Sequence, residues 1–113
     1  MDDCVFCKIA RGEIPSQRVL EDDSFLAFRD IDPRAPVHIL VIPREHLRSL
    51  DEIDGWRDGR GHELLAFAVR VAREAGINES GYRVVTNIGT DAGQEVDHLH
   101  LHVLGGGSLG GFW

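Results

Sequence analysis

The sequence predicts an α+β domain in which an antiparallel sheet of about five strands carries one long helix and a short N-terminal helix. Two observations predict this class: short β-like runs lie toward both ends of the chain, and one amphipathic helical pattern separates them. Strands, one helix and two further strands, in that order, are typical of α+β proteins with antiparallel sheets. At 113 residues the chain is expected to form one domain, with a flexible tail over residues 105–113.

The N-terminal third predicts a short helix followed by a hairpin. Residues 4–11 fit a helical turn that Gly12 ends. Two short strands, residues 18–21 and 25–29, flank a polar link, residues 22–24, of the kind that closes a hairpin. These two strands are therefore expected to be neighbours in the sheet.

A strongly β-like run follows over residues 37–42, and Pro43 is expected to end it because proline has no backbone N–H for a strand ladder. Strand alternation puts His38 on the same face as Leu40 and Ile42. A lone histidine in such a place is more often a hydrogen-bonded core residue than a functional one. His38 gains a functional interpretation only in combination with other residues.

The second half of the chain predicts one helix and two strands. Apolar residues recur at helical spacing after a polar stretch, residues 48–60, and Gly76 provides a natural helix end. A strand over residues 82–88, a glycine-rich loop and a strand over residues 98–104 complete the pattern. The apolar positions of the helix are Leu64, Ala68, Val71, Ala72 and Ala75.

Three histidines at alternate positions, His98, His100 and His102, form the most informative motif of the chain. Period-two spacing in an apolar run predicts that all three imidazoles leave one face of a strand, about 6.6 Å apart along the chain. A solvated polar face would not require half of the chain's six histidines within five residues. Two chemical interpretations remain, a metal site or a histidine-centred catalytic site.

The composition limits the partners. Nineteen acidic residues against 12 basic ones give a net charge of −7, which repels an extended nucleic acid but allows a small phosphorylated ligand. No apolar run approaches the roughly 18 residues needed to span a bilayer, and residues 1–3 lack a positive region. We therefore expect a cytoplasmic protein that does not bind membranes.

The only two cysteines, Cys4 and Cys7, form a Cys-x-x-Cys pair. In a reducing compartment such a pair is half of a metal site or a redox dithiol. A redox pair is expected between the strand and helix of a βαβ unit, and here no strand precedes it. The pair therefore favours metal over redox chemistry.

Residues 98–104 resemble the signature of the histidine triad family, His-x-His-x-His-x-x with apolar x. The resemblance extends over nearly the whole chain. Residues 25–31, 35–46 and 81–87 resemble the family's nucleotide-side strand, its central strand and the strand before the triad. The sequence Leu-Gly-Gly at residues 104–106 points to the Hint-like nucleotide hydrolases within the family.

The resemblance implies hydrolysis at the α-phosphorus of purine nucleoside monophosphate derivatives (AMP or GMP compounds), as in a phosphoramidase. His100 matches the nucleophile that forms a nucleotidyl-histidine intermediate, and His102 and His38 match the histidines that support it. Asp30 matches the carboxylate that binds the ribose, and Asn87 a polar contact near the phosphate. The apolar slot for the base would consist of Phe6, Ile9, Phe28, Ile31 and Leu40.

The resemblance also implies a structural zinc and a homodimer. In some relatives zinc binds an N-terminal Cys-x-x-Cys, a histidine after the central strand and the first triad histidine, which Cys4, Cys7, His46 and His98 match. A Cys2His2 set is a closed tetrahedral site, which suits a structural role. The family commonly pairs the long helix and the strand over residues 82–88 across a two-fold axis.

Some positions depart from the Hint-like pattern and concern the leaving group. Glu95 stands where much of the branch has a phosphate-contacting serine, so we expect Gln94, or a backbone N–H, to take over that contact. Gly107 replaces a common arginine, and the chain ends at Phe112-Trp113 in place of a longer tail.

Three alternatives to a phosphoramidase remain at this stage. One is a dinucleoside polyphosphate hydrolase or nucleotidyltransferase, which differs in leaving group or acceptor. Another is a non-catalytic nucleotide-binding or zinc-binding module. In the third, His98, His100 and His102 together bind one catalytic metal.

Overall fold

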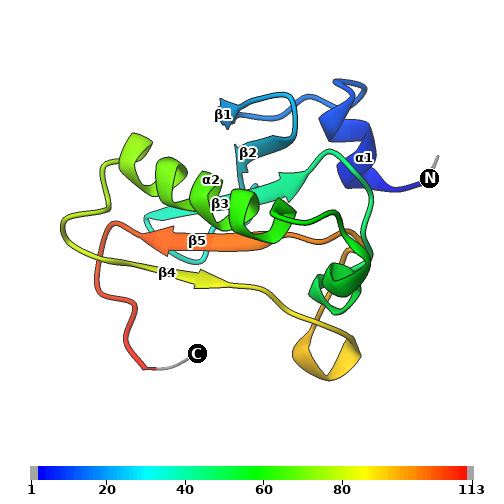
Figure 1. Ribbon diagram of the computed structural model, residues 1–113. Coiled ribbons are helices and arrows are strands. Elements are labelled where there is room, and N and C mark those ends of the chain that lie inside the picture. The colour runs from blue at the N-terminus through cyan, green and yellow to red at the C-terminus, as the bar shows by residue number, and fades with distance from the viewer. Residues whose placement is uncertain (1–2, 112–113) are drawn as a thin grey trace.

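The computed structural model describes residues 3–111 and contains one five-stranded antiparallel sheet, as predicted. The strand order is β1-β2-β3-β5-β4, so β3 lies at the centre (Figure 1). The strands are β1 (Arg18–Glu21), β2 (Phe25–Arg29), β3 (Val37–Pro43), β4 (Tyr82–Val85) and β5 (Leu101–Gly105). The helices are α1 (Val5–Ala10) and α2 (Arg60–Glu74), with 3-10 turns η1 (Leu50–Gly55) and η2 (Thr90–Ala92).

The predicted N-terminal helix and hairpin are confirmed. α1 is followed by Gly12, whose φ of 79° is a left-handed value that favours glycine. In the hairpin link, the Asp22 carboxylate accepts hydrogen bonds from the backbone N–H groups of Ser24 and Phe25, both at 2.8 Å. These two local bonds close the turn between β1 and β2, and Arg44 also donates to the backbone oxygens of Asp22 and Ser24.

Both faces of the sheet are buried at β3, and the two faces contact different helices. Ile39 and Val41 belong to the larger core, which includes the apolar face of α2. Leu40 and Ile42 point the other way and pack in a smaller core with Phe6 and other residues. The strand alternation predicted from the sequence therefore separates two cores, and His38 lies on the side of the smaller one.

The ends of α2 and β5 depend on glycines. α2 ends before Gly76, whose φ is 74°, and the backbone N–H of Ile77 donates to the carbonyl of Ala72, as in a glycine-terminated helix. A Cβ on Gly105 would lie 2.9 Å from Cδ1 of Ile77, so only glycine fits at the end of β5. Gly105 is buried within the sheet, so a tail cannot begin before Gly106.

Two strands are shorter than predicted. β4 ends at Val85, not at residue 88, and β5 begins at Leu101, so His98 and His100 precede the strand. The ladder ends because Thr86 bonds the His100 carbonyl through its side-chain hydroxyl, and the Leu99 N–H donates to the Leu47 carbonyl outside the sheet. The prediction that all three histidines lie on one strand was therefore wrong, but they still share one side of the chain. Leu99, Leu101 and Val103 belong to the larger core, whereas the rings of His98 and His100 contact Phe6 in the smaller core, and His100 contacts His102.

Residues 112 and 113, the predicted aromatic end of the tail, lie outside the described residues. Within residues 3–111, the chain has no helix of the length and apolar character that a membrane crossing requires.

Candidate active site and metal centre

His38 and His102 come from adjacent strands and are in direct contact. β3 and β5 pair so that Leu40 lies opposite His102, which places His38 diagonally across from His102 on the same face. Nε2 of His38 is 2.9 Å from Nδ1 of His102. The pairing of the two central strands thus builds a histidine pair from residues 64 positions apart.

The hydrogen bonds around this pair determine which nitrogen carries each proton. The backbone N–H of Arg34 donates to Nδ1 of His38 at 3.0 Å, so a neutral His38 carries its proton on Nε2. That Nε2–H can donate to Nδ1 of His102, which leaves the proton of His102 on its own Nε2. His102 therefore offers an N–H donor at the end of the chain of bonds.

His100 has the opposite arrangement. Its Nδ1 lies 2.7 Å from the backbone oxygen of His98, and because a carbonyl only accepts, Nδ1 must donate. Nε2 of a neutral His100 is then an unprotonated nitrogen with a free lone pair. An imidazole held in this tautomer can act as a nucleophile without a metal.

Burial keeps the supporting histidines neutral. Burial, together with the neighbouring His100 and His38, lowers the pKa of His102 to about 4. Burial also lowers the pKa of His38, although the Asp30 carboxylate partly opposes this. Both residues are therefore neutral near pH 7, which the hydrogen-bond assignment requires.

A second cluster lies beside the first and consists of Cys4, Cys7, His46 and His98, the four residues predicted to bind zinc. Sγ of Cys4 is 3.3 Å from Nδ1 of His98, and Sγ of Cys7 is 3.3 Å from Nδ1 of His46. A tetrahedral zinc with ordinary bond lengths separates a sulfur from a nitrogen ligand by about 3.6 Å. The four ligand atoms all lie within 4.8 Å of one another, so these residues fit the ion.

The lone pairs of this cluster are directed correctly for a metal. Nε2 of His98 is 2.9 Å from the backbone oxygen of Pro43 and must donate to it, so Nδ1 presents its lone pair to the two sulfurs. Burial and the adjacent Cys4 raise the pKa of the Cys7 thiol to about 11. A divalent cation would offset the cost of charge in this buried place.

Asp30, His38 and His102 also lie close enough together to be considered as metal ligands. A neutral imidazole has only one unprotonated nitrogen, and in His38 that nitrogen already accepts from Arg34. A metal at Nε2 of His38 would require this bond to break. A metal shared by all three triad histidines meets a similar obstacle, because the unprotonated Nδ1 of His102 already accepts from His38 and Nδ1 of His98 faces the cysteines.

Most residues predicted to form the base slot lie together. Phe6, Ile9, Phe28 and Leu40 belong to the smaller core, and each is at most 8% exposed. Ile31 lies apart from them and is fully exposed. The four buried side chains are therefore packed against one another more closely than side chains that line an open slot.

The predicted polar contacts are placed as follows. The Asp30 carboxylate is 19% exposed; one oxygen accepts from the Asp32 N–H, and the other lies 3.4 Å from Nε2 of His38. Asn87 is partly buried just beyond β4, and Glu95 is exposed. The contact with His38 places Asp30 at the histidine pair.

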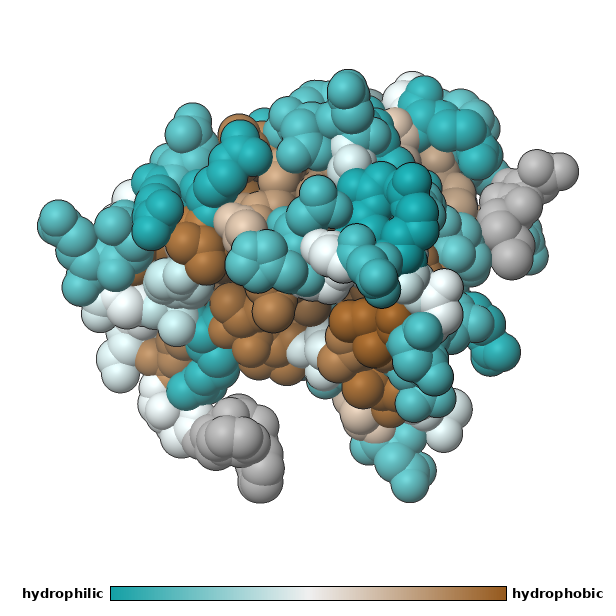
Figure 2. All heavy atoms as spheres, in the orientation of Figure 1, coloured by the Kyte–Doolittle hydropathy of each residue, from teal (hydrophilic) through white to brown (hydrophobic). Residues whose placement is uncertain are grey.

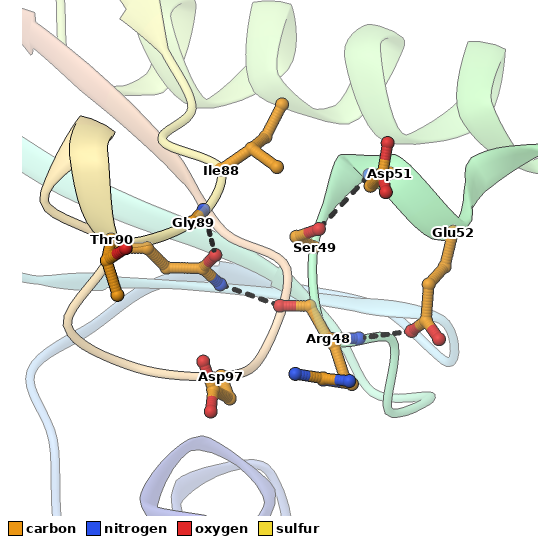
Figure 3. A pocket seen from close by; sticks show the side chains of 9 residues that line it. Arg48, Ser49, Asp51, Glu52, Ile88, Gly89, Thr90 and Asp97 are labelled. Carbon is orange, nitrogen blue, oxygen red and sulfur yellow. Dashed lines mark hydrogen bonds between the residues drawn. The ribbon is translucent and has the colours of Figure 1, made fainter.

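Gln94 connects three backbone segments near a cleft of about 440 Å³ (Figure 3). Its amide nitrogen donates to the backbone oxygens of Arg48 and Val96, and its amide oxygen accepts from the Gly89 N–H. Ser49, Asp51 and Asp97 also line the cleft. The side chain that was predicted to contact phosphate is therefore occupied in shaping the loop after β4.

Several groups that orient the site were missed because they are backbone atoms. The Arg34 N–H, the Pro43 carbonyl and the His98 carbonyl each fix one imidazole. Every residue has such groups, so no residue type signals them in a sequence.

Known proteins resemble this chain over almost its full length. A purine nucleoside phosphoramidase from Escherichia coli strain K12 is 41% identical over 109 residues, which cover 96% of this chain and 92% of that protein. A histidine triad protein from Clostridium difficile matches with a TM-score of 0.92 and 46% identity, covering 100% of this chain and 98% of that one. A HIT family hydrolase from Clostridium thermocellum matches with a TM-score of 0.87 and 42% identity, covering 98% and 96%. The HIT domain model matches residues 11–109, and the chain belongs to the HIT domain family.

Proposed function

We propose that the chain is a nucleotide hydrolase that cleaves the bond between the α-phosphorus of a purine nucleoside monophosphate and an amine leaving group. The observation that carries this proposal is the 2.7 Å bond from Nδ1 of His100 to the His98 carbonyl, which leaves Nε2 free to attack. The similarity to a purine nucleoside phosphoramidase supports the substrate class.

In the proposed first step, Nε2 of His100 forms a bond to phosphorus and the bond to the leaving group breaks. The leaving group takes the bonding electron pair and is protonated by water. The Nε2–H of His102 stabilises the negative charge that develops on the phosphate or on the leaving atom. Hydroxide then attacks phosphorus, which releases the nucleoside monophosphate and returns His100 to its neutral form.

In this proposal His38 maintains the donor role of His102. Its Nε2–H occupies Nδ1 of His102, so the proton of His102 stays on the nitrogen that faces the substrate. Asp30 accepts the ribose hydroxyls, and Asn87 contacts the phosphate. Ile31, the fully exposed member of the predicted slot, contacts the base, while Phe28 and Leu40 support it from the smaller core.

We also propose that Cys4, Cys7, His46 and His98 hold a structural zinc, which would join α1 to the segment that precedes β5. Bound there, the metal would supply cross-linking and no chemistry at phosphorus, because four protein ligands leave no open position. The free lone pair on Nδ1 of His98 supports this assignment.

A homodimer is the proposed assembly. The predicted helix positions Leu64, Ala68 and Val71 are buried within the chain's own core and cannot serve as the interface. Leu65 on α2 and Val84 on β4 remain 57% and 40% exposed. Apolar side chains gather on this face, and β4 is an edge strand, so both features support a second copy as the partner (Figure 2).

The experiment that tests the proposed activity is hydrolysis of an adenosine phosphoramidate by the wild-type chain and by His100→Ala. We expect turnover by the wild type and its loss, by about 10³-fold or more, in the variant. Wild-type activity in His100→Ala would refute the nucleophile. A preference for diadenosine polyphosphates over phosphoramidates would instead favour the polyphosphate hydrolase, and nucleotide binding without turnover would favour a binding module.

A further inference from the structure

We infer that Phe6 is a positioning residue that holds the imidazole of His100 in its attacking orientation. The two rings meet edge to face, with centroids 5.2 Å apart and planes at 87°. This is a favoured geometry for an aromatic pair. The kinetic part of the inference rests on the proposed function, whereas the structural part does not.

A second contact is needed because one hydrogen bond does not fix a ring. The bond from Nδ1 to the His98 carbonyl holds one corner of the His100 imidazole and sets its tautomer. Rotation of the ring about its Cβ–Cγ bond would move Nε2 away from a phosphorus atom and would also stretch the Nδ1 bond that sets the tautomer. Phe6 and His102 both contact the His100 ring, at 5.2 Å and 5.1 Å between centroids, and restrict that rotation.

Phe6 can restrict the ring only if its own helix is fixed, and α1 is fixed at both ends. At the start, Sγ of the capping residue Cys4 lies 3.3 Å from Nδ1 of His98. At the end, Arg18 donates to the Ile9 carbonyl and Arg44 to the Ala10 carbonyl, both at 2.9 Å. A helix of six residues is not stable alone, so these contacts determine its position.

The chain position of Phe6 adds a connection to the metal cluster. Phe6 lies between Cys4 and Cys7, and its ring also contacts that of His98 edge to face at 6.0 Å. The helix that would be cross-linked by a metal is therefore the helix that presents a ring to the nucleophile. Phe6 is only 7% exposed, so little of it is available to line a slot for a base.

The test is Phe6→Leu in the metal-loaded full-length chain, with Phe67→Leu as the matched control. Phe67 is also buried, at 2% exposed against 7% for Phe6, but lies in the other core. For each protein we would measure metal content, kcat and KM for an adenosine phosphoramidate, the Kd of AMP, and the imidazole 15N chemical shifts. These shifts distinguish protonated from unprotonated ring nitrogens and are read in the free enzyme.

For Phe6→Leu we expect kcat to fall about tenfold, with KM and the Kd of AMP changed less than about twofold. The 15N shifts of His100 should change from a single tautomer to a mixture, while Phe67→Leu leaves them as in the wild type. Should Phe6→Leu fail to fold, Phe6→Met, which fills similar space without a ring, is measured in the same way.

Two outcomes would overturn the inference. An increase in KM and Kd with unchanged kcat and unchanged 15N shifts would make Phe6 only a wall of the base slot. Equal changes in Phe67→Leu would make the effect one of general stability. If the wild type does not hydrolyse phosphoramidates, the proposed function fails, but the 15N shifts still decide whether Phe6 orients His100.

Discussion

The two histidine clusters of this chain use the same side chain in opposite ways. In the pair of His38 and His102, each Nδ1 accepts a hydrogen bond, from the Arg34 N–H and from His38. In the cysteine cluster, Nε2 of His98 donates to Pro43 and its Nδ1 lone pair faces the sulfurs of Cys4 and Cys7. Whether a histidine relays hydrogen bonds or binds a metal therefore depends on which of its ring nitrogens keeps an available lone pair, and not on the residue type.

Loss of the metal should have the largest effect, which we expect on thermal stability. It also tests most directly whether the cysteine cluster, and not the histidine pair, binds the metal. We expect one zinc per wild-type chain and none in Cys7→Ser, with a thermal midpoint lower by about 10 °C or more, since metal binding contributes to folding. Asp30→Asn, in the other cluster, should keep its zinc. Elemental analysis and thermal unfolding measure both. A zinc-free wild type, or a metal lost with Asp30, would reverse the assignment.

Disruption of the histidine pair should act on turnover and leave the metal in place. His38→Leu removes the N–H that holds the tautomer of His102. We expect kcat for an adenosine phosphoramidate to fall about 10²-fold, with the zinc content unchanged. Steady-state kinetics alongside metal analysis would check this. An unchanged kcat would show that the pair is structural.

The buried histidine pair should also make stability depend on pH. In the unfolded chain His102 takes up a proton near its ordinary pKa of 6.5, whereas in the folded chain its pKa is about 4. Between these values the unfolded state binds more protons, so the free energy of unfolding decreases as the pH falls through this window.

Denaturant unfolding at several pH values between about 7 and 4 would measure this dependence. His102→Gln serves as the control, because the contributions of other groups, including the metal ligands, are common to both proteins. The wild type should show the steeper decrease. Identical slopes would contradict the assignment of a depressed pKa to His102.

The smallest effect is expected for Gln94, in the loop between β4 and β5. Gln94→Ala removes hydrogen bonds to the backbone of Gly89, Arg48 and Val96 and should lower the free energy of unfolding by about 1–2 kcal/mol. We expect kcat/KM to change only a few fold. A loss of about 10²-fold with unchanged stability would instead place Gln94 at the phosphate.

Local patterns in the sequence predict most of the fold. Alternation in β3 predicts its two faces, and the helical repeat with Gly76 predicts α2 and its end. The start of β5 could not be predicted in this way, because the Leu99 N–H is taken by the Leu47 carbonyl, which is distant in sequence. A strand ends where its backbone finds another partner, and such partners have no local signature.

The sequence by itself determined which chemical groups are present and which segment of the chain carries each one, because periodicity and residue type are local properties. Only the tertiary structure decided what each imidazole can do. His98 and His100 have the same side chain, yet Pro43 bonds Nε2 of the first and the His98 carbonyl bonds Nδ1 of the second. A ring nitrogen becomes a ligand, a nucleophile or a donor according to which backbone group approaches the other nitrogen, and that approach requires the folded chain.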